Sequence, residues 1–229
     1  MGEGATAPLI VAIDGPSGVG KTTVARAVAR RLGVPYLGTG SMYRAVALQV
    51  LDRGVDPSDR DAVEALARAA DLGFGLDRDG FLEVRLDGEP VGDRIQGLRV
   101  AQVTSQISVY RGVRQRMVEL QREWAGRHGA VVEGRDIGTR VFPGTPHKFF
   151  LDAPLEVRVE RRWRELERRE GKTSRDDVGR EVAERDHRDT SRADSPLTCD
   201  DSYHRIDTGG YAAPEVVDLI VAAVSPPLP

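Results

Sequence analysis

An apolar run that ends in a glycine-rich turn, followed by Lys-Thr and an amphipathic segment, constrains this chain more than any other feature. The stretch IVAIDGPSGVGKTTVARAVARRLG occupies residues 10–33. Residues 9–13 suit a buried parallel strand, and residues 22–32 have apolar side chains at helical spacing, with Gly33 as a natural stop. A strand, a glycine turn and a helix in this order form a cradle for phosphate, because the turn and the helix N-terminus both present backbone N–H groups to an anion.

Within this stretch, GPSGVGKT satisfies the phosphate-loop pattern G-x-x-x-x-G-K-[ST], with a strand before it and a helix after it. Lys21 is expected to reach the β- and γ-phosphates of a nucleotide, and the Thr22 hydroxyl to bind Mg²⁺. Glu133, which ends the apolar run AVVEG, is a candidate to support that metal through water. The residues predicted to bind ATP are Gly15, Pro16, Ser17, Gly18, Val19, Gly20, Lys21, Thr22 and Thr23.

The phosphate loop alone does not separate a GTPase, an ATPase motor and a small-molecule kinase. The guanine signature Asn-Lys-x-Asp is absent from the sequence. Five short apolar runs alternate with helical patterns, which favours an α/β fold with a parallel sheet and ligands at the C-terminal ends of its strands.

Residues 72–96 depart from this pattern. Their apolar–polar alternation around RDG and DGE turns predicts short antiparallel strands in an inserted subdomain.

The composition of the chain further limits the kind of protein that it can be. The chain has 229 residues, 40% of them apolar, which suffices for one sizeable core, or one core with a small insert. A net charge of -3 argues against a nucleic-acid partner, and no apolar run reaches the ~18 residues of a membrane span. Cys199 is the only cysteine, so no disulfide can form within the chain. We therefore expect a cytoplasmic monomer.

A kinase must also hold an acceptor in line with the γ-phosphate, and a phosphorylated acceptor requires converging arginines. Three stretches supply candidates: GTGSMYRA with Thr39, Tyr43 and Arg44; EGRDIGTRVFPG with Arg135 and Asp136; and ERDHRDTSR with Arg185, Arg188, Asp189 and Arg192. The last four would share one face of a helix. Alternatively, the third stretch is a solvated charged face, and Arg135-Asp136 forms only a local salt bridge.

These stretches also carry a family resemblance. The chain resembles bacterial cytidylate kinases, which phosphorylate CMP and dCMP with ATP, over nearly its whole length. The resemblance rests on VAIDGPSGVGK (11–21), TGSMYR (39–44), LEVRLDGEPV (82–91), EGRDIGTRVFP (133–143), KFFLDA (148–153), ERDHRDTSRADSPL (184–197) and IDT (206–208). The GRDIGT and RDxRDxxRxxxPL patterns, in this order, discriminate more sharply than the phosphate loop does.

The resemblance implies the fold of a P-loop nucleoside monophosphate kinase. A five-stranded parallel sheet flanked by helices would carry a small β-rich insert that binds the acceptor nucleotide, and a helical lid. The whole chain, residues 1–229, would be a single kinase domain. Its core would comprise residues 8–62, 97–154 and 200–225, with the CMP-binding insert at about 66–97 and the lid at about 155–185.

The resemblance also implies roles for individual residues. The acceptor phosphate would be contacted by Tyr43, Arg44 and Arg135, with Thr39 beside them. The cytosine ring would be read by Ser105, Arg114 and Asp136. The sugar hydroxyls would be held by Arg185 and Asp189, while Arg192 would reach the phosphate side. Charge on the transferred group would be compensated by Lys21, Arg135, Arg161, Arg162 and Arg192, and Arg158 would bind ATP when the lid closes.

Reading cytosine with Asp136 makes chemical sense, because a carboxylate accepts from the exocyclic amine of cytosine and repels the carbonyl of uracil. Three positions depart from the family pattern: Gly38 and Glu133 each stand where aspartate is usual, and Arg111 stands where proline is common. Two alternatives stay open. The chain could be another small-molecule P-loop kinase, acting on UMP, AMP or a sugar acid, or an ATP-binding switch that signals to a partner.

Overall fold

The computed structural model describes residues 7–76, 82–171 and 174–224. Five parallel strands form the central sheet in the order β2-β6-β1-β7-β8. In chain order they are β1 (Ile10–Asp14), β2 (Tyr36–Gly38), β6 (Ala130–Glu133), β7 (His147–Asp152) and β8 (His204–Asp207). The five-stranded parallel sheet predicted from the sequence is therefore confirmed.

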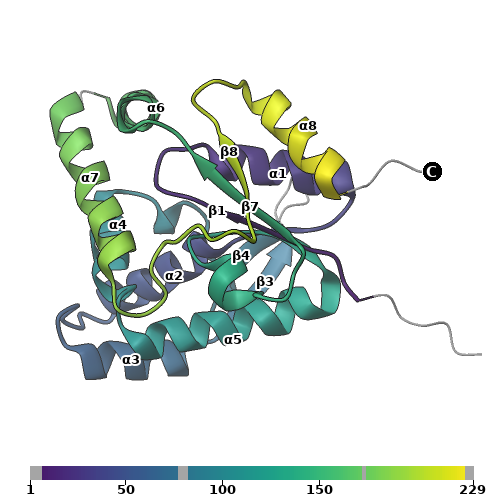
Figure 1. Ribbon diagram of the computed structural model, residues 1–229. Coiled ribbons are helices and arrows are strands. Elements are labelled where there is room, and N and C mark those ends of the chain that lie inside the picture. The colour runs from purple at the N-terminus through teal and green to yellow at the C-terminus, as the bar shows by residue number, and fades with distance from the viewer. Residues whose placement is uncertain (1–6, 77–81, 172–173, 225–229) are drawn as a thin grey trace, which may run out of the picture.

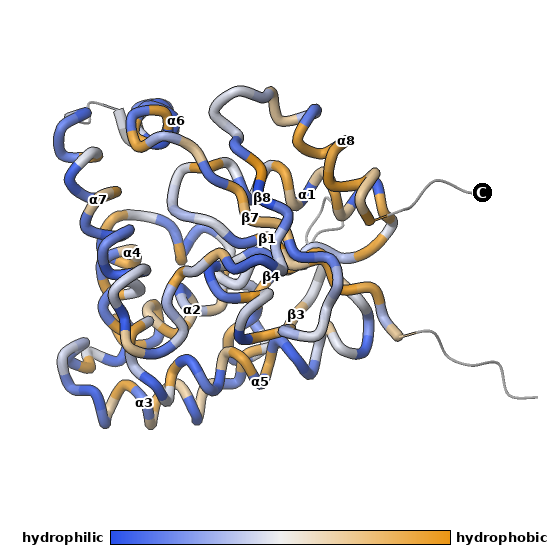
Figure 2. Tube along the Cα trace, viewed as in Figure 1, coloured by the Kyte–Doolittle hydropathy of each residue, from blue (hydrophilic) through white to orange (hydrophobic). Residues whose placement is uncertain are grey.

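Helices cover both faces of this sheet (Figure 1). Val11 and Ile13 of β1 lie in a core that includes α1 (Lys21–Leu32) and α8 (Ala213–Val224). Ala12, between them, belongs to the core on the other face, with α2 (Thr39–Asp52) and α5 (Arg111–His128). Because both faces of β1 are buried, its residues from Ile10 to Ile13 are all apolar instead of alternating with polar residues. Figure 2 shows α8 as largely hydrophobic, as expected for a helix that packs on the sheet.

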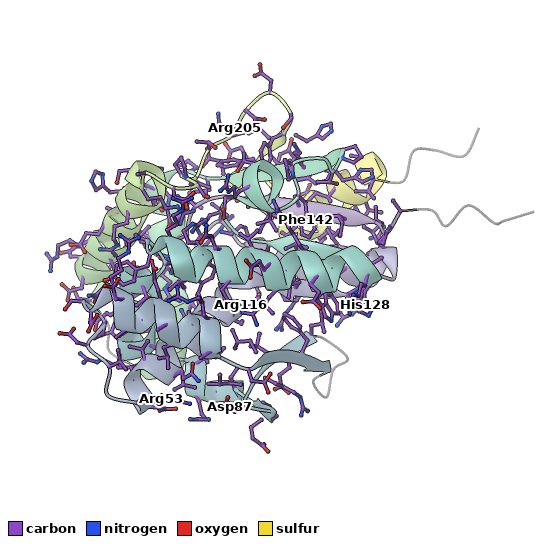
Figure 3. All side chains as sticks on the ribbon, turned by 90° about the horizontal axis from the view of Figure 1, so that it is seen from below. Arg53, Asp87, Arg116, His128, Phe142 and Arg205 are labelled. Atoms are coloured by element: carbon purple, nitrogen blue, oxygen red, sulfur yellow. The ribbon has the colours of Figure 1, made fainter. Side chains whose placement is uncertain are left out.

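A second, antiparallel sheet contains β3 (Leu72–Leu76), β4 (Leu82–Leu86) and β5 (Glu89–Pro90). The predicted DGE turn joins β4 to β5, and both Asp87 and Gly88 have positive φ, as tight hairpin turns require. The predicted RDG turn at 78–80 lies outside the described residues. Asp87 lies at one edge of the molecule, on the far side of α5 from Arg205 (Figure 3). Leu72, Val84 and Leu86 pack on the same core as α2, which fixes the insert to the domain.

Three further segments connect the insert with the core. Helix α3 (Arg60–Ala69) begins at Asp59, whose side chain accepts a hydrogen bond from the Ala62 N–H. A short 3-10 turn, η1 (Gly92–Ile95), follows the insert and leads to α4 (Leu98–Ile107). Helices α4 and α5 are separated by residues 108–110.

Helices α6 (Leu155–Glu170) and α7 (Arg175–Ser191) form a unit at one side of the sheet (Figure 1). They share a small apolar cluster of their own, made by Val159, Leu166, Val178 and Val182. Helix α7 is otherwise mostly hydrophilic (Figure 2), because only two of its side chains are fully buried. This pair of helices lies where the lid was predicted and continues to Ser191. No described helix has the length and apolarity that a membrane span needs.

Candidate active site

The phosphate loop between β1 and α1 packs closely against the backbone of β7 and α6. At Gly15, a Cβ would lie 2.1 Å from the carbonyl oxygen of Leu151 in β7. At Gly18, a Cβ would lie 2.8 Å from the carbonyl oxygen of Arg158 in α6. Both glycines also have positive φ, +150° and +80°. The loop therefore needs glycine for close backbone approach as well as for its conformation.

Lys21 opens α1 and its side chain folds back into the loop. Its Nζ donates to the carbonyl oxygen of Pro16 at 2.6 Å, and the residue is only 6% exposed. Burial, together with the positive charge of Arg135, holds the pKa of Lys21 well below its ordinary value. Bound phosphate would stabilise the charged ammonium and oppose this shift, so the residue is placed to respond to an anion.

Thr22 and Glu133 meet where β1 and β6 end side by side. The Thr22 hydroxyl donates to Oε1 of Glu133 at 3.0 Å, and the Thr39 hydroxyl donates to the Glu133 carbonyl at 2.8 Å. The second carboxylate oxygen of Glu133, Oε2, is buried without a hydrogen-bond partner. A hydroxyl and a carboxylate with a spare oxygen form the donor set that a hard cation such as Mg²⁺ prefers.

A cluster of arginines lies next to Lys21. Arg135 donates to Asp189 at 2.8 Å and lies close to Arg185. Burial, reinforced by the charge of Arg135, lowers the pKa of Arg185 to about 10. Burial opposes ionisation of Asp189, but the charges of Arg135 and Arg185 outweigh it and lower the pKa of that carboxyl. Arg44 and Arg162 add further positive charge near Arg185. The cluster gathers several arginines around Asp189, and such converging arginines suit a phosphate group.

Asp136 and Arg114 form a buried ion pair at the next turn of the chain. Arg114 Nη2 donates to Asp136 Oδ2 at 2.5 Å, and the two side chains are 4% and 9% exposed. Arg192 lies 3.9 Å from the other oxygen of Asp136 and 3.5 Å from Asp189, so it links this pair to the arginine cluster. Tyr43 completes the group, and its burial raises the pKa of its hydroxyl to about 12. One buried nitrogen of Arg192, Nη2, has no hydrogen-bond partner.

The turn that carries Asp136 is held by a residue that the sequence reasoning missed. Asp14, the last residue of β1, is fully buried and accepts hydrogen bonds from the N–H groups of Ile137 and Gly138, each at 2.9 Å. It also accepts from the Tyr203 hydroxyl at 2.7 Å. Burial raises the pKa of this carboxyl to about 6. An ionisable residue at the end of an apolar strand was the available signal, but the sequence does not show what it contacts.

The comparisons with known proteins match this geometry. A family model described as "Cytidylate kinase" matches residues 11–226. The chain belongs to the cytidylate kinase family. It is 43% identical over 215 residues to the cytidylate kinase of Pelotomaculum thermopropionicum, covering 94% of this chain and 95% of that protein. The cytidylate kinase of Solibacter usitatus is 43% identical over 218 residues, covering 94% of this chain and 92% of that protein.

Among solved structures, an uncharacterized protein from Eubacterium ventriosum matches with a TM-score of 0.50 and 14% identity, covering 94% of this chain and 98% of that chain. That likeness concerns the fold alone. Family membership makes the chain a nucleoside monophosphate kinase that uses ATP as its phosphoryl donor. The roles of the phosphate loop, the arginine cluster and the Arg114–Asp136 pair in that activity are proposed below.

The three lid arginines predicted for this kinase contact different groups. Arg158 donates to the carbonyls of Ala153 and Ser17, at 3.0 and 3.2 Å, and pairs with Asp186. Arg161 donates to the Thr208 hydroxyl at 2.9 Å and to the Thr208 carbonyl at 2.7 Å. Arg162 pairs with Glu165 at 3.0 Å. Arg158 therefore ties the lid helix α6 directly to the phosphate loop.

Two further residues predicted for the site, Ser105 and Arg188, lie on α4 and α7. Ser105 lies half-buried on α4, and Arg114 reaches the end of that helix through a hydrogen bond of 3.4 Å to the Ser108 carbonyl. Arg188 was expected on the same helix face as Asp189; its side chain is 43% exposed and pairs with Glu184 at 3.7 Å. Arg188 also lines a surface pocket together with Arg192 and Asp194.

Thr208 is a second contributor that the sequence reasoning missed. Its hydroxyl lies 3.1 Å from the carbonyl oxygen of Val19 in the phosphate loop and 3.1 Å from that of Asp152 in β7. With Arg161 donating to it, this threonine connects the lid helix, the loop and the end of the sheet. The IDT motif was quoted only as part of the resemblance, and no role was predicted for its threonine.

Proposed function

We propose that this protein transfers the γ-phosphate of ATP to CMP or dCMP, giving CDP or dCDP and ADP. The observation that carries the proposal is the buried Arg114–Asp136 pair, linked through Arg192 to the arginine cluster beside Lys21. A nucleoside monophosphate has a base at one end and a phosphate at the other. The site offers a hydrogen-bonding pair for the first and concentrated positive charge for the second.

The carboxylate of Asp136 would select the base. It accepts a hydrogen bond from the exocyclic amine of cytosine but faces the carbonyl of uracil with like polarity. An unpaired buried polar group costs about 1–3 kcal/mol, which corresponds to a preference for CMP over UMP of roughly 10- to 100-fold. Arg114 holds the carboxylate at 2.5 Å, so the acceptor oxygens are fixed before the base arrives.

The phosphoryl transfer itself would need no general base, because the acceptor is already an anionic phosphate. Catalysis would come from positioning and from compensation of charge on the transferred group. Lys21 and Arg135 are near enough to affect each other's ionisation, so both would act on the same phosphate oxygens. Arg185 and Asp189 would hold the sugar hydroxyls, and Arg44 and Tyr43 the acceptor phosphate. Arg158, Arg161 and Arg162 would compensate charge from the lid.

Thr22 and Glu133 would hold Mg²⁺ together with the phosphates of the nucleotide. When bound, the cation would supply positive charge that neutralises the charge developing on the transferred phosphoryl group. The hydroxyl of Thr22 and the unpartnered Oε2 of Glu133 provide oxygen ligands of the required kind. All these groups come from one chain, so the proposed reaction requires only a monomer.

A coupled assay of ADP release tests the proposal with ATP and Mg²⁺ plus CMP, dCMP, UMP, AMP or no acceptor. We expect fast turnover with CMP and dCMP, slow turnover with UMP and AMP, and little ADP without an acceptor. The matched control is Arg180→Ala, which removes an exposed arginine of α7 and should retain the wild-type rate. Faster turnover with another acceptor would favour another small-molecule kinase, and ADP release independent of every acceptor would favour a switch.

A further inference from the structure

Tyr36 is a buried tyrosine at the edge of the nucleotide site that the proposed chemistry has not used. It begins β2 and is 6% exposed. Strand β2 pairs with β6 so that Gly38 lies opposite Glu133. The Tyr36 hydroxyl lies close to the Thr22–Glu133 group, because hydrogen bonding with both of those side chains affects its pKa. A phenol hydroxyl therefore lies beside the two oxygen donors of the proposed metal site.

Gly38 provides the space that this hydroxyl occupies. A Cβ placed on Gly38 would lie 2.5 Å from the Tyr36 hydroxyl oxygen and 3.0 Å from its Cζ. The backbone of Gly38 is extended, with φ of -85° and ψ of 97°, which any amino acid can adopt. Glycine is therefore not needed here for backbone conformation. Its relevant property is the absence of a side chain, which leaves room for the tyrosine.

A further contact helps to hold the tyrosine ring in place. The guanidinium of Arg26 lies over the ring, 5.4 Å from its centroid. The hydroxyl is a hydrogen-bond donor, and the Glu133 carboxylate beside it is an acceptor.

We infer that Tyr36 is a positioning residue whose hydroxyl, admitted by Gly38, orients the Thr22–Glu133 pair toward the divalent cation that accompanies the nucleotide. Thr22 already donates to Oε1 of Glu133, and a second donor on the same side leaves the buried Oε2 as the carboxylate's free oxygen. Tyr36 touches neither substrate nor reacting atoms in this scheme. The inference rests on the proposed function for the location of Mg²⁺, and it adds a donor that this chain supplies from β2.

Calorimetric titration of ATP into the protein, with and without Mg²⁺, tests this role without relying on turnover. Two variants remove the contact in different ways: Tyr36→Phe deletes only the hydroxyl, and Gly38→Ala displaces it. Mg²⁺ should increase the ATP affinity of the wild type. In each variant, we expect this increase to be roughly 3- to 10-fold smaller. ATP affinity without metal, CMP affinity and the thermal midpoint should stay close to wild type.

Matched controls separate the proposed role from general effects. Tyr211→Phe removes a hydroxyl from a residue that is 48% exposed, and Gly40→Ala adds a Cβ where no atom lies within 4 Å. Both should keep the full metal effect. If Tyr36→Phe and Gly38→Ala also keep it, or lose ATP affinity equally with and without metal, the inference is wrong while the proposed kinase activity stands. If wild-type ATP binding does not respond to Mg²⁺, the proposed metal location is wrong as well.

Discussion

Asp14 gives the sharpest quantitative prediction, because a fully buried carboxylate should leave a signature in the pH dependence of stability. Its pKa is raised from 3.8 to about 6, chiefly by burial, against the opposing effect of three hydrogen bonds. In the unfolded chain the group ionises near its ordinary pKa, whereas in the folded protein it holds its proton to higher pH. The favourable contribution of Asp14 to the free energy of unfolding is therefore complete below the pKa of the unfolded chain. It is lost as the pH rises through about 6, the pKa in the folded protein.

The size of the effect follows from the shift. A difference of about two pKa units corresponds to about 3 kcal/mol in total, of which about 2 kcal/mol is lost between pH 4.5 and pH 7. Other groups titrate in this range too, so the observable is a difference between two proteins. Asp14→Asn keeps the shape of the side chain and removes the ionisation. The free energy of unfolding of the wild type should fall by about 2 kcal/mol relative to this variant over that interval.

Urea denaturation of both proteins at four or five pH values between 4.5 and 7 provides the measurement. Asp201→Asn serves as the control, because Asp201 is exposed and its replacement should leave the pH dependence of the wild type unchanged. A constant difference between wild type and Asp14→Asn at every pH would refute the reasoning. It would mean that the three hydrogen bonds compensate the burial of Asp14 completely and that its pKa is not raised.

Two further substitutions test the packing of the nucleotide site. Gly15→Ala should abolish soluble folded protein or lower the thermal midpoint severely, because its Cβ would lie 2.1 Å from the Leu151 carbonyl oxygen. In a thermal melt, Gly144→Ala, whose Cβ meets no atom within 4 Å, should melt like wild type, and equal stability of the two variants would contradict the close approach. Thr208→Val should raise the KM for ATP roughly 10-fold and leave the KM for CMP unchanged, because it removes the hydroxyl that receives Arg161. Steady-state kinetics with ATP and CMP varied in turn measures both KM values. A change in the KM for CMP alone would show that the contact serves the acceptor.

The sheet and most helices were predictable from the sequence because their signals are local. The apolar runs of β1, β6 and β7 are buried on both faces, and the period of α8 places Val216, Val217 and Ile220 inside. Helix α7 was harder, because its polar sequence buries only Val178 and Val182, against another helix of the lid. Its pattern was compatible with a helix but did not distinguish one from a solvated segment.

Some residues of the candidate site also have local sequence signals, and others do not. The phosphate loop is one continuous motif, so its residues could be named from the sequence alone. The Asp14–Tyr203 contact spans 189 positions in the chain, and no local pattern encodes it. Charges spaced for one helix face do not reveal which of them face solvent: the side chain of Arg188 is 43% exposed, whereas that of Arg192 is 6% exposed.

The preference for cytosine tests the central claim most directly. Calorimetric titration of CMP and UMP into the wild type and Asp136→Asn measures it at equilibrium, without the complication of phosphoryl transfer. We expect the wild type to bind CMP roughly 10- to 100-fold more tightly than UMP. The amide of the variant can donate as well as accept, so the preference should fall to about threefold or less. Equal affinities in the wild type, or an undiminished preference in the variant, would contradict the role assigned to the Arg114–Asp136 pair.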